Sequence, residues 1–453
     1  MRRTLVTLAV MALAACAPVL PQATRGAVAA ARMDLPPLRR FSGAPALAIP
    51  VQSNRSLARD FMALTFRLET GTQLDTFTRF EGPITVGVEA RGPVPATLGP
   101  DLDDLLARLR TEAGIEIARA TPGEKPSITV SALPRATLAR HVPGAACFVV
   151  PRVSGWADYL ARRRTAAVDW TTLVTRSRVS VFLPADVSPQ EIRDCLHEEL
   201  AQALGPLNDL YRLPHSVFND DNMHVVLTDY DMTILRATYD PRLASGMSRD
   251  AVAARLPAIL ADANPRGGVA TQEAAASDAN WDAALRGALD PAGTDRTRLD
   301  SARRAVALAE AADWPDGRLA MSHLALGRAA LPLDGDEAVA SFRTAERTYR
   351  RAFGLGLQTA QVSIQLAAFA LSSGRADIAL AELDQAIPAA YDGQNAALLA
   401  TLLLMRAEAV ELRGDAAEAR DTRREGLAWG RYAWGDAALT RQAAEVASLR
   451  PAA

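Results

Sequence analysis

Lysine is almost absent from this 453-residue sequence, because Lys125 is the only one and every other basic residue is arginine. Acidic and basic residues nearly balance, with a formal net charge of −2. Proteins that bind nucleic acid usually carry a marked excess of positive charge. We therefore expect no nucleic-acid partner.

Two common catalytic motifs are also missing. The sequence has no GxSxG nucleophile elbow, which argues against a serine hydrolase of the α/β type. The GLGL stretch at residues 354–357 lacks the preceding strand and the lysine of a phosphate-binding loop. The sequence thus offers neither a serine nucleophile in a known setting nor a nucleotide site.

The sequence lacks a long hydrophobic run at its N-terminus. Residues 5–13 are apolar, but they are too few for a stable membrane span. Arg2 and Arg3 precede this run, and LAAC, ending at Cys16, follows it and matches the lipobox of bacterial lipoproteins. An ordinary signal peptide cleaved near Ala15 is the alternative.

The lipobox predicts a signal peptide over residues 1–15 and a lipid on Cys16. Residues 16–40, rich in alanine and proline, would form a lipidated tether. The expected location is the cell envelope, with the protein anchored to a membrane through its lipid and facing the periplasm.

Cysteine is scarce as well. Besides Cys16, the chain has only Cys147 and Cys195. Two cysteines in an exported protein can form a disulfide, which we predict here. The alternative is a pair of buried free thiols, since unpaired cysteine packs well in a core.

Residues 41–270 read as an α+β domain with a mixed sheet. Patterns of apolar residues predict strands at 84–90, 127–133, 146–150 and 179–183, and helices at 55–68, from residue 100, at 189–204, at 228–237 and at 249–261.

The helix at 189–204 has clear end signals. Ser188 can cap it, Pro189 suits the first helical position, and Glu191 would complete a capping box. Gly205 and the proline after it end the helix.

Polar side chains occur on the apolar face of this helix. Glu199 falls within the apolar arc, Gln202 lies at its edge, and Glu198 lies beyond. A buried carboxylate is costly unless it is paired, hydrogen-bonded or bound to a metal. We expect Glu199 to join a polar network with Glu198, Gln202, Asn208 and Asp209.

The spacing of these residues resembles the HExxHxxGxxH/D signature of the metzincins, a group of zinc peptidases. Glu199 and Gly205 hold the positions of the general base and the turn glycine, whereas Glu198, Gln202 and Asn208 replace the three zinc ligands. Amides are weak zinc ligands. The resemblance implies a zincin-like domain without standard zinc catalysis, and we expect no metal or other cofactor.

Two ways of holding a metal stay open. An oxygen-preferring ion such as calcium or manganese could bind at Glu198 and Gln202, with Asn208 or Asp209 completing its ligands. A rearranged site could instead use three nearby histidines, which are His197, His215 and His224.

Four segments carry a further resemblance: RFEGPITV, CLHEELAQALG, LNDLYRLPHSVFND and YDPRLASGM. Through them, residues 55–249 resemble the DUF2927 family of uncharacterised proteobacterial proteins, which are often lipoproteins. The family implies no known activity, and the lipobox and the C-terminal helices lie outside the resemblance.

The C-terminal part, residues 281–453, is repetitive and helical, and a linker at 271–280 precedes it. Gly335, Gly374 and Gly414 recur at a spacing of about 40 residues, each between two apolar helical segments. This period predicts stacked helical hairpins that resemble a tetratricopeptide array, and we expect the array to bind a protein partner.

Three functions are compatible with these features. The first is a cell-envelope lipoprotein with a non-catalytic zincin-like domain and a helical scaffold that binds a protein or an envelope polymer. The alternative is an atypical metal-dependent, peptidase-like hydrolase with Glu199 as general base. The third is an assembly factor whose front domain is purely structural.

Overall fold

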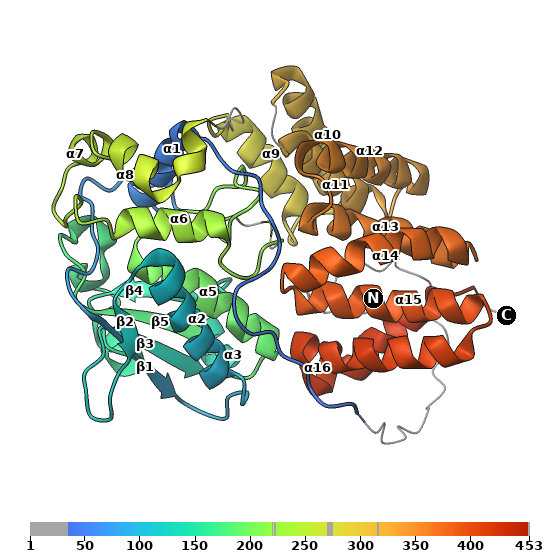
Figure 1. Ribbon diagram of the computed structural model, residues 1–453, viewed down its shortest axis with the longest axis horizontal. Coiled ribbons are helices and arrows are strands. Elements are labelled where there is room, and N and C mark those ends of the chain that lie inside the picture. Colours follow the sequence, from blue (N-terminus) through green and yellow to red (C-terminus); the bar gives the residue numbers. More distant parts are fainter. Residues whose placement is uncertain (1–34, 220, 222, 270–274, 315–316, 452–453) are drawn as a thin grey trace, which may run out of the picture.

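The computed structural model describes residues 35–219, 221, 223–269, 275–314 and 317–451. The predicted signal peptide, Cys16 and most of the predicted tether lie outside these residues. Figure 1 shows an α+β half that packs against a stack of helices, which confirms the predicted fold class. Among the residues described, no helix is long and apolar enough to cross a membrane.

A five-stranded sheet forms the centre of the front domain. Its order is β2-β1-β3-β5-β4, with β4 antiparallel to β5 and the other neighbours parallel. The strands are β1 (Ile84–Ala90), β2 (Ile117–Arg119), β3 (Ile128–Leu133), β4 (Phe148–Pro151) and β5 (Val179–Pro184). The predicted strands are confirmed, and β2 is an additional edge strand of three residues, too short to give a periodic signal.

Helices surround this sheet. They are α1 (Asn54–Thr65), α2 (Leu98–Ala113), α3 (Arg135–His141), α4 (Trp156–Arg162), α5 (Pro189–Leu204), α6 (Asp229–Thr238), α7 (Arg249–Ala253) and α8 (Leu256–Ala263), with short 3-10 turns at Ala166–Val168, Trp170–Thr172 and Pro265–Gly268. The single helix predicted at 249–261 is wrong, because Pro257 belongs to the first turn of a new helix, α8.

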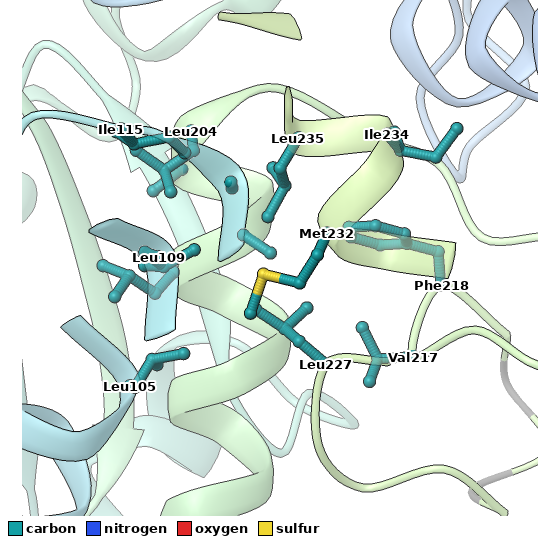
Figure 2. Close-up of a cluster of buried hydrophobic side chains, with 14 of the residues drawn as sticks. Leu105, Leu109, Ile115, Leu204, Val217, Phe218, Leu227, Met232, Ile234 and Leu235 are labelled. Carbon is teal, nitrogen blue, oxygen red and sulfur yellow. The ribbon is translucent and has the colours of Figure 1, made fainter. Parts of the chain in front are cut away.

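The main core lies where α2, α5 and α6 meet. Figure 2 shows side chains from these helices and from the loops between them converging on Met232. Leu105 and Leu109 come from α2, and Leu204 comes from α5. This packing fixes α5 between the sheet and α6.

Both ends of α5 follow from local sequence. The Ser188 hydroxyl accepts a hydrogen bond from the Glu191 amide at 3.2 Å, while the Glu191 carboxylate accepts from Arg135 rather than closing the predicted capping box. At the other end, a Cβ added to Gly205 would lie 2.8 Å from a methyl group of Thr238 on α6. Glycine therefore allows the close approach of these two helices.

A disulfide joins α5 to the edge of the sheet. Cys147 directly precedes β4 and bonds to Cys195 in the middle of α5, with 6.0 Å between the two Cα atoms. The bond links the residue before β4 to α5, and Cys147 packs against the edge of the core.

Arg176 caps the C-terminal end of α5. The side chain is buried, and its guanidinium donates to the carbonyl oxygens of Gln202, Ala203 and Gly205 at 2.6–2.7 Å. These carbonyls have no partner within the helix, and a cation also complements the negative end of the helix dipole. Burial lowers the pKa of Arg176 to about 10, so the guanidinium stays charged at neutral pH.

The second half consists of helices paired in hairpins: α9 (Ala279–Leu289) with α10 (Asp295–Ala312), α11 (Arg318–Ala330) with α12 (Gly335–Phe353), α13 (Leu357–Ser372) with α14 (Ala376–Asp392), and α15 (Ala396–Leu412) with α16 (Ala416–Ala447). Gly374 and Gly414 have the positive φ of turn glycines, whereas Gly335 is the first residue of α12, capped by Asp334. The predicted tetratricopeptide-like stack fits this arrangement.

The two halves share a buried interface. Residues 35–50, dark blue in Figure 1, run between the front domain and α16. Phe41 stacks on Trp429 with 4.2 Å between ring centroids, and the Arg193 guanidinium of α5 lies 5.8 Å from the Phe41 ring. Gln190 of α5 accepts from the Ala396 amide at 2.8 Å. The N-terminal half of α5 thus contacts the repeats directly.

Replacing Arg176 with methionine tests its role as the cap. We expect Arg176→Met to destabilise the protein by at least about 3 kcal/mol, because three carbonyls in the core lose their donors. The measurement is denaturant unfolding followed by circular dichroism. Arg178→Met is the matched control, since Arg178 is exposed two residues further on. Equal stability of both variants would contradict the capping role.

Candidate functional site

Glu199 lies on the buried face of α5, as its position in the apolar arc indicates. Its side chain is 5% exposed. Burial raises the pKa of Glu199 well above its usual value, and the negative charges of Glu198 and Glu69 raise it further. Oxygen Oε2 has no hydrogen-bond partner among the residues described. The carboxyl is therefore favoured in its neutral, protonated form.

Gln202 lies one turn further along the helix and faces two other carboxylates. Its amide nitrogen is 3.2 Å from Oε1 of Glu69 and 3.5 Å from Oδ2 of Asp209. Glu69 lies in an exposed turn after α1, more than 130 residues upstream in the sequence. No local signal links Glu69 to the motif, so sequence reasoning missed it.

Asn208 has a structural partner of its own. Its amide donates to the carbonyl oxygen of Ala63 at 3.0 Å, and the neighbouring Leu207 amide donates to Leu64 at 2.8 Å. These bonds attach the loop after α5 to the C-terminal end of α1. The single network expected around Glu199 is therefore divided: Gln202 joins Glu69 and Asp209, and Asn208 joins α1.

The residues at the zinc-ligand positions do not fit a zinc ion. Gln202 and Asn208 offer amides, which are poor zinc ligands, and both amides are engaged with protein groups. Glu198 is half-buried, and its negative charge helps to raise the pKa of both Asp194 and Glu199. Within the described ranges, no group of three or more His, Cys, Asp or Glu side chains is placed to hold a metal.

His197, one of three candidates for a rearranged site, serves as a hydrogen-bond acceptor. Its Nδ1 accepts from the Leu227 amide at 3.1 Å, at the entrance to α6. Burial lowers the pKa of His197 well below its usual value, with Arg193 and Arg108 adding to the effect. A neutral ring with Nδ1 as acceptor fits this bond.

The other two histidines lie at the interface between the halves. The Gln358 amide of α13 is 3.5 Å from Nδ1 of His215 and 3.3 Å from Nε2 of His224, and it donates to the Pro214 carbonyl. Burial lowers the pKa of His215 to about 3 and that of His224 to about 4, so both rings are neutral at neutral pH. His215 and His224 thus share Gln358 as a neighbour, whereas His197 bonds to Leu227.

The region that contains α5 matches a known protein family. Residues 54–258 match the model of DUF2927, described as a protein of unknown function. This region of the chain belongs to the DUF2927 family. No curated protein and no solved structure matches the chain significantly. The matched region contains the sheet, α5 and the polar residues around Glu199.

Changing Glu199 to glutamine tests the burial of its carboxyl. Because the pKa of Glu199 is raised in the folded state, its contribution is most favourable below about pH 4.5, the ordinary glutamate value, and is lost as the pH rises. We expect Glu199→Gln to match the wild type in acid and to exceed it above neutral pH by on the order of 1–3 kcal/mol.

The measurement is the free energy of unfolding as a function of pH. Glu116→Gln, at an exposed position of the same domain, is the control and should give a much flatter difference. A Glu199→Gln variant that is less stable than the wild type above neutral pH would show that the ionised carboxylate has a favourable partner.

Proposed function

We propose that the chain is a lipid-anchored protein of the cell envelope, in which a non-catalytic zincin-like domain supports a helical scaffold. The scaffold would bind a protein or an envelope polymer. The lipobox ending at Cys16 supports the anchor, and the stacked hairpins of α9–α16 support the scaffold, because such arrays offer extended binding surfaces.

One observation carries the non-catalytic assignment. The side chains of Gln202 and Asn208, at two of the three ligand positions, hold Glu69, Asp209 and the end of α1 in place. A metal at α5 would have only the amide oxygens of these two side chains, which are weak ligands for zinc. These hydrogen bonds hold the loops around α5 in place.

The other half of α5 supports the scaffold role. Gln190 and Arg193 bond to Ala396 and Gln394 at the start of α15. On α16, the Tyr432 hydroxyl donates to Asp101 of α2 at 2.8 Å. These buried bonds hold the repeats at a fixed angle to the DUF2927 domain, as a scaffold with a defined binding geometry requires.

The alternative is an atypical metal-dependent hydrolase, and one observation favours it. Glu199 combines a raised pKa with a buried, unpaired Oε2, which are properties of a general acid or base. In that case Glu198, Gln202 and Asp209 would surround an oxygen-preferring cation that activates water. The Gln202 amide could contribute its oxygen while its nitrogen keeps the bond to Glu69.

Replacing Cys16 with serine tests the anchor. We expect the wild type to fractionate with membranes and Cys16→Ser to be released from them, because the lipid attaches only to the cysteine. The measurement is fractionation of cells that express the full chain, combined with the intact mass of the purified mature protein. A Cys16→Ser variant that stays in the membrane fraction would contradict the lipid anchor.

The same cells test the non-catalytic assignment. Treatment with a chemical crosslinker should give the same adducts in the wild type and in Glu199→Gln, since the carboxyl would take no part in binding. Adducts that differ between the wild type and Glu199→Gln would show that the carboxyl takes part in binding, which would favour the hydrolase.

A further inference from the structure

Helix α16 carries its positive and negative side chains on different faces. At about 100° per residue, Arg420, Arg423, Arg424 and Arg431 fall within an arc of roughly 100°. Three acidic residues fall on a separate arc: Glu418, Asp421 and Glu425. The first turns of α16 therefore present a continuous arginine face.

The arginines on this face differ in their partners. Arg423 bonds to Glu408 and Glu411, and Arg431 bonds to Asp436 and to the Pro36 carbonyl. Arg420 and Arg424 are exposed and have no ion pair or hydrogen bond with any residue that the structure describes. Two guanidinium groups thus remain without a neutralising partner.

A cavity of about 520 Å³ lies beside these two arginines. Its lining combines Arg420, Arg423 and Arg424 with apolar side chains, which are Leu35, Pro36, Pro37 and Leu427. Guanidinium groups bind phosphate through charge-assisted hydrogen bonds. The apolar lining suits the hydrocarbon portion of an amphiphile, so the cavity combines the two features of a phospholipid headgroup site.

Leu35, which lines the cavity, is the first residue that the structure describes. Cys16 is 19 residues before Leu35. At about 3.3–3.6 Å per residue, this length spans at most roughly 65 Å. A lipid on Cys16 would keep the arginine face within reach of the membrane, whose anionic lipids attract arginine.

We propose that Arg420 and Arg424 bind the phosphate of an anionic phospholipid headgroup in this cavity. The contact orients the anchored protein with α16 toward the membrane and the remaining hairpins away from it. The orientation rests on the proposed lipid anchor, whereas the recognition of the headgroup depends only on α16 and residues 35–37.

The test uses the chain from Met33 onward, which contains every described helix and strand but lacks Cys16. It is sedimented with phosphatidylcholine vesicles that contain or lack phosphatidylglycerol. We expect binding only to the anionic vesicles, decreasing with salt. Arg420→Glu/Arg424→Glu should lower the partition coefficient at least about tenfold, since each arginine near an anionic surface contributes appreciably.

The matched control is Arg343→Glu/Arg347→Glu. These arginines are exposed on α12 with the same spacing, and α12 lies away from α16 in Figure 1. The control should keep the wild-type partition, and equal melting temperatures should show that both variants are folded.

Three results would overturn the proposal. They are an absence of wild-type binding to anionic vesicles, an equal loss in the control, and binding of glycerol 3-phosphate in a calorimetric titration without vesicle binding. The last result would assign the cavity to a soluble phosphate compound. Because Cys16 is absent from this chain, vesicle binding and lipid attachment can fail independently.

Discussion

The position of α5 depends on the bonds between Arg176 and the carbonyl groups at the end of that helix. A guanidinium has five donors, and four of them are used here: Thr78 accepts from Nε at 3.2 Å and three carbonyls accept from the other nitrogens. The side chain also lies 5.0 Å from the Trp170 ring. The cap fixes the end of the helix and therefore the position of the loop that carries Asn208 and Asp209.

Arg176 fixes the C-terminal end of α5, and the other polar residues of the helix bond to neighbouring segments of the protein. Gln190 and Arg193 bond to the repeats, His197 accepts from the backbone before α6, and Gln202 bonds to the turn that holds Glu69. Each contact is made by a different turn of the helix. The DUF2927 domain and the repeats thus both bond to α5. We therefore expect a substitution in α5 to affect the stability of both halves.

Apolar patterns in the sequence predicted β1, β3, β5 and α5, although β3 and β5 are buried on both faces. Signals of the ends of α5 were also local, since Ser188 and Gly205 act within or next to the helix. The side chains that bond to the polar residues of α5 and of the following loop could not be predicted from local sequence. Glu69, Arg176 and Gln358 come from distant segments that read as an exposed turn, a polar loop and a repeat helix. Only the folded chain brings Glu69 and Arg176 to α5, and Gln358 to the segment that follows α5.

The metzincin-like spacing indicated which residues are buried but not what they contact. Glu199 is buried as expected, but its neighbours are carboxylates rather than the amides that follow it in sequence. The helix keeps the spacing of the signature in its sequence, and the side chains of Gln202 and Asn208 bond to other protein groups.

The measurement that tests this account most directly is the metal content of the tag-free protein from Met33 onward, with and without chelator. The account predicts less than one equivalent of any metal and the same melting curve after chelation, because α5 is held by protein groups. One tightly bound metal per chain, whose removal lowers the melting temperature and which is lost in Glu198→Ala, would contradict it.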